Sequence, residues 1–199
     1  MRTPSTRIRR VLTWASAPLA VLAAGAMIWS GSSAAFTAET HNTGNNWETG
    51  SVALTDSDAG GAMFAVGNLT PGDSGSKCIV VTATSDVTGI VRTYLETMTP
   101  GGLQDHILVG VEAGTGGTFS DCTGFTATSS EPSMSLSTMS SSHGSYATGL
   151  LPWSKGTGAQ SKTYKLSWAF DTTGLDEAAV NALQSTDVGA TFEWELQND

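Results

Sequence analysis

Two segments of the chain alternate strictly between apolar and polar residues, a pattern that predicts half-buried β-strands. In Ser161–Asp171 the residues on the apolar face are Tyr164, Leu166, Trp168 and Phe170. In Ala190–Gln197 they are Ala190, Phe192, Trp194 and Leu196. Each segment therefore turns one face toward a core. The polar face of the second segment carries Glu193 and Glu195, which we interpret as part of an acidic outer surface rather than as a catalytic pair.

Six further segments are predicted strands, because turn signals flank short apolar or β-branched runs. They are Phe36–Thr40, Gly50–Thr55, Ala62–Val66, Lys77–Ala83, Gly89–Glu96 and His106–Glu112. Lys77–Ala83 has apolar side chains on both faces, which favours a central strand. Thr99–Gly102 separates the last two segments and predicts an antiparallel hairpin with a long loop.

The remaining segments predict one helix and one surface excursion. The helix covers Thr173–Leu183, with Thr173 as its N-cap and Asp176 three residues later. Residues 114–155 are rich in Ser, Thr and Gly, too polar to build a second core. Apolar residues that can still dock this excursion on the sheet are Met134, Leu136 and Met139. Together these elements predict an all-β fold, an antiparallel β-sandwich of jelly-roll-like or Ig-like type, as a single domain over residues 36–199.

The first 35 residues have the three-part pattern of a secretory signal. Four arginines and no acid lie in residues 1–10, an apolar run follows, and small residues precede a predicted cleavage site near Ala34 or Ala35. The alternative is a retained membrane anchor, since the apolar run is near the lower limit for a span, roughly 17 residues. Cleavage would place the short strand Phe36–Thr40 at a new N-terminus. Such a strand can pair within its own domain or with the sheet edge of another molecule.

Charge excludes one class of partner. Four of the 9 Lys and Arg residues, and none of the 18 acidic residues, lie before residue 36, so the following 164 residues have a net charge of −13. The five remaining basic residues are widely scattered and make no basic patch, which argues against nucleic-acid binding. An acidic surface rich in Ser, Thr and Gly is typical of a soluble extracellular protein, with membrane contact only through the signal segment before cleavage.

The chain has two cysteines, Cys78 and Cys122. In an exported protein an even pair predicts a disulfide, which would close a loop of 44 residues. Two unpaired buried thiols are the alternative. A metal site at this pair is disfavoured, because neither a C-x-x-C motif nor a neighbouring histidine accompanies it.

No catalytic motif is present: the sequence lacks H-E-x-x-H, G-x-S-x-G and a P-loop. The three histidines are His41, His106 and His143. A zinc site assembled from His41 and His143 with Glu39 or Glu48 stays open as an alternative. We predict no cofactor and no catalytic residue.

Residues 56–60 have the D-x-D-x-G pattern of a calcium-binding loop. An acidic residue is expected at the twelfth position of such a loop, where this chain has Gly67. We therefore interpret these residues as a solvated turn.

Several short motifs together resemble the TasA/camelysin family of secreted bacterial proteins. They are A-A-F at the signal end (Ala34–Phe36), E-T-G-S-V-A-L (Glu48–Leu54), N-L-T-P-G-D-S (Asn68–Ser74), N-A-L-Q (Asn181–Gln184) and A-T-F-E-W-E-L (Ala190–Leu196). The most specific is the N-L-x-P-G-D motif, formed by Asn68, Leu69, Pro71, Gly72 and Asp73. Its Pro-Gly pair also predicts a type II turn. The resemblance covers both ends of the chain after residue 34 and not the middle, about 114–155.

The resemblance implies a jelly-roll-like sandwich, export, and assembly into extracellular fibres of a biofilm matrix. In fibre-forming members the N-terminal segment pairs as a donor strand with the next subunit. Carried onto this chain, the donor is about 35–45, and its strand residues are Ala35, Phe36, Thr37, Ala38, Glu39 and Thr40. The turn at 44–46 would be the hinge. The implied partner is a second copy, in a head-to-tail homopolymer, with other matrix or cell-surface components. The cysteine pair departs from the cysteine-free pattern of the fibre proteins.

Two other function classes stay open. Camelysin members are described as metal-dependent peptidases, although the chain has no recognisable zinc motif. A monomeric cell-surface binding module is the third possibility, with Trp47 and Trp153 as residues that can stack on sugars. Packing of both tryptophans in the core or at a strand edge is the simpler interpretation.

Overall fold

The two alternating segments form one long strand in each of two sheets. A computed structural model describes residues 37–40, 52–119 and 121–198. Strand β8 (Gly158–Phe170) begins three residues before its predicted start and ends one residue early, and β9 (Asp187–Asn198) extends beyond both predicted bounds. The apolar face of each is turned inward, and the rings of Tyr164 and Trp194 meet between the sheets at a centroid distance of 5.6 Å.

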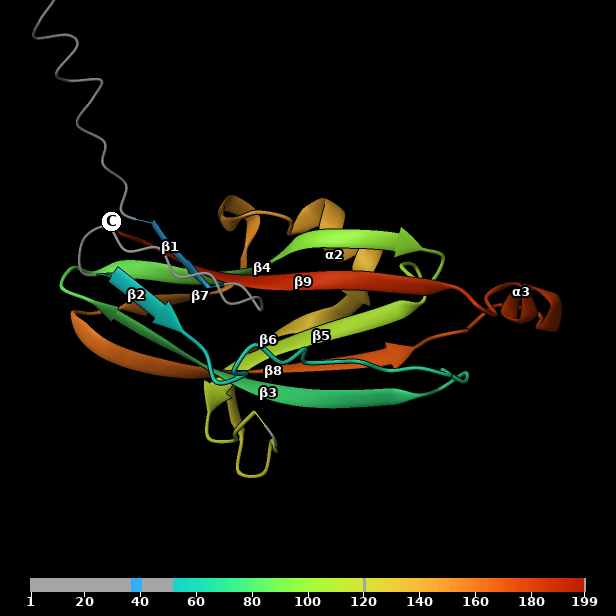
Figure 1. Cartoon of the computed structure of the whole chain (residues 1–199), viewed down its shortest axis with the longest axis horizontal. Helices are drawn as coiled ribbons and strands as arrows, with labels where there is room; N and C mark the ends of the chain where they lie inside the picture. The colour runs from blue at the N-terminus through green and yellow to red at the C-terminus, as the bar shows by residue number, and fades with distance from the viewer. Residues whose placement is uncertain (1–36, 41–51, 120, 199) are drawn as a thin grey trace, which may run out of the picture. The chain divides into compact units, whose positions relative to one another are not determined.

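Antiparallel pairing joins the strands of the described residues into two sheets (Figure 1). One sheet has the order β1-β9-β4-β7, and the other has the order β2-β3-β8-β5-β6. The bounds are β1 Thr37–Thr40, β2 Val52–Thr55, β3 Ser74–Ser85, β4 Gly89–Gly101, β5 Ile107–Thr115, β6 Thr126–Ser135 and β7 Leu150–Lys155. Side chains from both sheets form one apolar core. The predicted all-β sandwich is therefore confirmed.

Strand β3 has buried side chains on both faces, as the sequence predicts. Ile79 and Val81 point into the core and are almost wholly buried. Cys78 is on the opposite face and is also buried, because Cys122 reaches it from a loop that covers this side of the sheet.

The predicted hairpin of residues 89–96 and 106–112 is wrong. β4 pairs with β9 and β7, whereas β5 pairs with β8 and β6 in the other sheet. The link between them crosses from sheet to sheet. Alternation determines which face of a strand is buried, but it does not determine the partner of the strand.

The segment predicted as a surface excursion contributes two strands to the sandwich. β6 pairs with β5, and β7 pairs with β4. Between them lie helix α2 (Leu136–Ser142), which Ser135 caps by accepting from the Thr138 amide, and the short helix η1 (Tyr146–Thr148). Leu136 and Met139 are buried in the core and Met134 packs against it, so the predicted docking of these residues is confirmed. Ser and Thr suit β6, whose side chains are mostly exposed.

The predicted helix is shorter than expected. α3 covers Glu177–Ala182, and its N-cap is Asp176, whose carboxylate accepts from the Ala179 amide at 2.8 Å. Thr173 instead donates its hydroxyl to Asp171 at 2.6 Å. A carboxylate at the N-cap accepts a hydrogen bond more strongly than a hydroxyl does. A helix capped by Asp176 is therefore favoured over one capped by Thr173.

Residues 62–66, a predicted strand, are not one. They belong to a segment, Ala62–Leu69, that has no regular secondary structure and runs between β9 and β3 (Figure 1). We name Ala62–Leu69 the crossing segment.

Candidate functional site

Strand β1 covers only a third of the edge of β9. Its four residues Thr37–Thr40 pair with Trp194–Gln197, and β9 itself has 12 residues. On its other side β9 pairs with β4 along its whole length. Among the described residues no strand pairs with the β1-facing edge of residues 187–193. Backbone N–H and C=O groups of an open edge can pair with another strand.

One edge of strand β3 is likewise paired along only part of its length. The four residues of β2 pair with Thr82–Ser85, at the end of β3. The preceding residues of β3 have no strand partner on that side in the described part of the chain. One amide there, that of Val80, donates to the hydroxyl of Ser57 at 3.0 Å. The uncovered edges of β9 and β3 thus lie on the same side of the sandwich, with the crossing segment between them (Figure 1).

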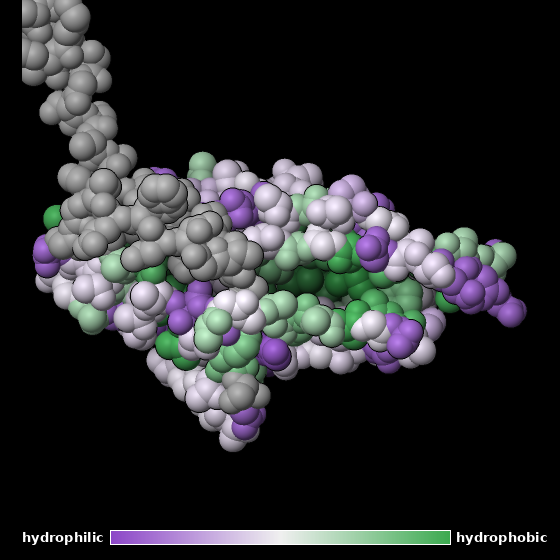
Figure 2. Space-filling model, viewed as in Figure 1, coloured by the Kyte–Doolittle hydropathy of each residue, from purple (hydrophilic) through white to green (hydrophobic). Residues whose placement is uncertain are grey.

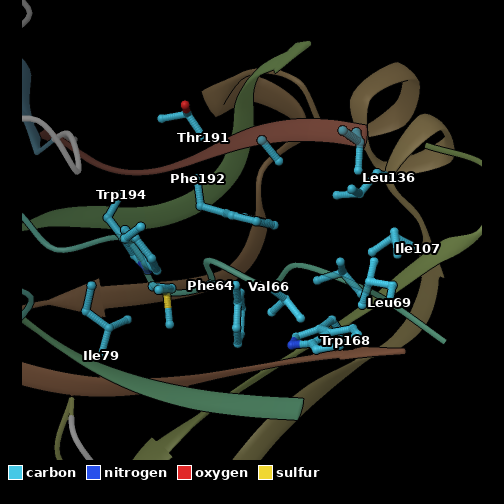
Figure 3. A pocket seen from close by; sticks show the side chains of 15 residues that line it. Phe64, Val66, Leu69, Ile79, Ile107, Leu136, Trp168, Thr191, Phe192 and Trp194 are labelled. Carbon is cyan, nitrogen blue, oxygen red and sulfur yellow. The ribbon is translucent and has the colours of Figure 1, made fainter. Parts of the chain in front are cut away.

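An apolar cavity of about 250 Å³ lies at this open side. Figure 2 shows it as a hollow lined by hydrophobic surface. The side chains that define it are Phe64, Val66, Leu69, Trp168, Val188 and Phe192. In Figure 3 Phe192 extends from β9 into the cavity. The cavity therefore adjoins the uncovered edge of β9.

Side-chain contacts hold the crossing segment in the described part of the chain. Met63 is 8% exposed, and Phe64 meets Trp168 edge-on at a centroid distance of 6.4 Å. Val66 is 49% exposed at the mouth of the cavity. In the described part of the chain, no hydrogen bond is made by the backbone of residues 62–69.

The family-like motif forms the turn at the C-terminal end of the crossing segment. Gly72 has φ +88°, as the predicted type II turn requires of its third residue. The Thr70 amide donates to the Asp73 carboxylate at 2.8 Å, and the Asp73 amide donates to the Thr70 carbonyl at 3.0 Å. The amide of Gly72 also donates to the carbonyl of Phe170, which ties this turn to the end of β8. Of the remaining motif residues, Asn68 has φ +56°, Leu69 packs on the core and Pro71 is exposed.

The turn at the other end of the crossing segment contains a buried carboxylate. Ser57, Ala59 and Gly60 are exposed, as expected of a solvated turn, whereas Asp58 is only 6% exposed. One carboxylate oxygen of Asp58 accepts from the Gly60 amide at 2.7 Å, and the other is buried close to the Asp56 side chain. Burial, and then the neighbouring Asp56, raise the pKa of Asp58 to about 6.

The acidic face of β9 is buried, contrary to the prediction of an exposed surface. Glu193 is 1% exposed and Glu195 is 5% exposed. The Tyr94 hydroxyl donates to Glu195 at 2.8 Å, and the Gln197 amide donates to the same carboxylate at 2.7 Å. Burial, and then the bond to Glu195, raise the pKa of Tyr94 well above its usual range. These hydrogen bonds allow a polar group to be buried on the outer face of the sheet.

The predicted disulfide between Cys78 and Cys122 is present, with a Cα–Cα distance of 5.4 Å. It fastens the loop after β5 to the outer face of β3. From this loop Phe119 lies under the ammonium group of Lys77, 4.7 Å from the ring centroid. Phe119 also contacts the core and lies beside Gly61. The disulfide loop therefore packs against the N-terminal end of the crossing segment.

The other sequence-predicted residues are only partly described. Ala34, Ala35, Phe36, His41 and Trp47 lie outside the described residues. Ala38 and Glu39 are in β1, opposite Leu196 and Glu195. Trp153 is buried in the core, so the simpler interpretation of that residue is confirmed.

No candidate metal centre is evident within the described ranges, where no three His, Cys, Asp or Glu side chains come together. His143 contacts the Thr148 carbonyl through Nδ1 at 2.7 Å, and His106 lies at the start of β5. No described helix is long and apolar enough to cross a membrane.

Comparison with known proteins gives no relative: no protein-family model and no curated protein matches this chain. The open side of the sandwich was not predicted from the sequence. The signal that could have found it is the crossing segment itself, a run with Met63, Phe64, Val66 and Leu69 interrupted by Gly67 and Asn68.

Proposed function

We propose that this chain is a secreted structural subunit of extracellular fibres, of the TasA/camelysin type, which assembles by N-terminal strand exchange. The observation that carries the proposal is the partial cover of β9: β1 pairs with Trp194–Gln197 and leaves residues 187–193 beside an apolar cavity. In assembly, the N-terminal segment of one copy would pair with this edge in the next.

An open strand edge beside an apolar cavity suits an extended peptide. Main-chain hydrogen bonds to the edge give affinity, and a cavity that takes alternate side chains gives specificity. Residues 35–38 have the sequence Ala-Phe-Thr-Ala. In a strand, Phe36 and Ala38 fall on one face, while Thr37 falls on the other. Phe36 is the residue that we assign to the cavity of the next copy.

Head-to-tail pairing extends into a filament rather than closing into a dimer. The donor is at the N-terminus, and the acceptor edge is near the C-terminus, so the two contact surfaces differ. Heterologous contacts of this kind generate open polymers unless the rotation between copies closes a ring. Each copy would then have one donor strand, at its N-terminus, and one acceptor edge, on β9.

Secretion is part of the same proposal. The disulfide between Cys78 and Cys122 supports it, because such bonds persist in oxidising compartments. The signal-like first 35 residues and the acidic remainder of the chain agree with this location.

The test compares purified protein starting at Phe36 with a version starting at Asn46, by negative-stain electron microscopy. We expect filaments from the longer form only. A Phe36→Asp variant of the longer form should also stay monomeric, whereas the neighbouring Thr37→Asp change should not prevent assembly. Circular dichroism verifies that each monomer is folded. Folded monomers from the unaltered longer form, at all concentrations and with seeds, would disprove the proposal.

A further inference from the structure

The crossing segment Ala62–Leu69 lies where an incoming strand has to enter. It runs between the uncovered edges of β9 and β3, and its side chains form one wall of the cavity (Figures 1 and 3). Donor and crossing segment therefore compete for the same space.

The two ends of this segment are fixed and its middle is not. At the N-terminal end, Ser57 accepts from the Val80 amide of β3, and the Gly61 amide donates to the Asp58 carbonyl. At the C-terminal end, Gly72 and Asp73 are hydrogen-bonded to Phe170. Between these anchors, the described structure gives the backbone of residues 62–69 no hydrogen bond. As far as the described residues show, the middle can leave the cavity without breaking a backbone hydrogen bond.

Side-chain burial is what keeps the middle in place. Met63 is buried in the core, Phe64 packs edge-on against Trp168, and Leu69 packs on the core from the other end. A donor strand offers what this segment lacks, because it can pair with the backbone of residues 187–193 while it fills the cavity. When the donor strand replaces the crossing segment, its apolar contacts take the place of those of the segment. The donor strand adds backbone hydrogen bonds to them.

We propose that the crossing segment is an internal plug: it occupies the acceptor cavity of the unassembled chain and has to swing out before a second copy can donate its N-terminal strand. This proposal rests on the proposed function and adds how assembly is restrained. Release of the plug precedes donor entry, so it limits the rate of filament growth. A single chain is thereby protected from premature pairing at an open edge.

The first test measures whether the plug leaves. In the form starting at Phe36, Met63→Cys introduces a thiol at a site that is 8% exposed, and Val66→Cys introduces one at a site that is 49% exposed. We expect a maleimide to label Cys at position 66 quickly in monomer and filament alike. At position 63 labelling should be slow in the monomer and at least about tenfold faster in the filament. If the thiol at position 63 is protected from labelling equally in the monomer and in the filament, the proposal is overturned.

The second test measures the rate at which filaments elongate from seeds. Phe64→Ala removes the ring that packs on Trp168, so filaments should elongate from seeds about tenfold faster or more. Ala65→Ser is the control in the same segment: Ala65 is exposed and does not line the cavity, so this variant should elongate at the unaltered rate. Thermal unfolding of both variants identifies any loss of the fold.

The outcomes separate the two proposals. Filaments that grow from the unaltered protein, with position 63 still protected and Phe64→Ala growing at the same rate, would refute the plug and leave strand exchange intact. Absence of filaments from every version, with seeds present, would refute strand exchange and the plug together.

Discussion

Filling the cavity should stabilise the single chain and hinder assembly at once. Ala190 lines the cavity from β9 and lies on the same face of the strand as Phe192. Ala190→Leu adds three carbon atoms at this position. Ala159→Leu is the matched control, because Ala159 is exposed on β8 and does not line the cavity.

The size of the effect follows from the burial of those carbons. Each buried methylene contributes about 0.8 kcal/mol, which gives an upper limit of about 2.4 kcal/mol for three. The cavity is open at its mouth, so we expect a gain of about 1–2 kcal/mol in the free energy of unfolding. Crowding is not expected, because about 250 Å³ is several times the roughly 30 Å³ that one water molecule occupies in the liquid.

The assay is urea unfolding of the monomer, followed by tryptophan fluorescence, with seeded filament growth measured in parallel. Ala190→Leu should unfold at higher urea and elongate more slowly than the unaltered protein. Ala159→Leu should change the unfolding free energy by less than about 0.5 kcal/mol, as expected of a surface substitution. A less stable Ala190→Leu monomer would show that the cavity cannot accept the side chain. A more stable monomer with unchanged growth would place donor binding elsewhere.

Three further predictions concern stability. Replacing Cys78 and Cys122 together by Ala should cost about 4 kcal/mol in guanidinium unfolding, because the bond closes a loop of 44 residues in the unfolded chain; a cost below about 1 kcal/mol would contradict this. The pKa of Asp58 is raised from 3.8 to about 6, so its contribution to stability is present below pH 3.8 and lost as the pH rises through 6. Asp58→Asn should therefore stabilise by up to about 3 kcal/mol at pH 8 and hardly at all near pH 4, and equal effects at both would refute the assignment. Tyr94→Phe should cost about 1–3 kcal/mol in thermal unfolding, because Glu195 loses a buried donor, and a neutral effect would be inconsistent with that bond.

The strands that could be predicted are those with large apolar side chains on one face. β8 and β9 alternate so regularly that their inward residues were identified from the sequence. β3 was found because its apolar residues lie between clear turns. In each case burial of one face determines the pattern, and the pattern can be recognised without knowledge of the partner.

Other elements could not be predicted, because the types of their residues do not reveal which segments pack against them. β6 is built largely of exposed Ser and Thr, and such a composition is shared by strands at an edge and by loops. The crossing segment has the apolar content of a strand, yet in the described structure it lies between two strand edges without pairing with either. Burial of Glu193 and Glu195 depends on what covers the outer face of β9, which alternation along β9 does not describe.

The candidate site is a consequence of unequal strand lengths. A strand of four residues beside one of twelve leaves an edge that alternation within either strand cannot reveal. An uncovered edge beside an apolar cavity is a liability in a soluble monomer, and proteins usually protect such edges. Here the protection that lies over the cavity is a segment held by Met63, Phe64 and Leu69, without backbone hydrogen bonds in the described structure. A permanent cover would gain stability from pairing with the edge. A cover held by side chains alone is what a reversible cover requires, and this is why we assign the open side to assembly rather than to a defect of the fold.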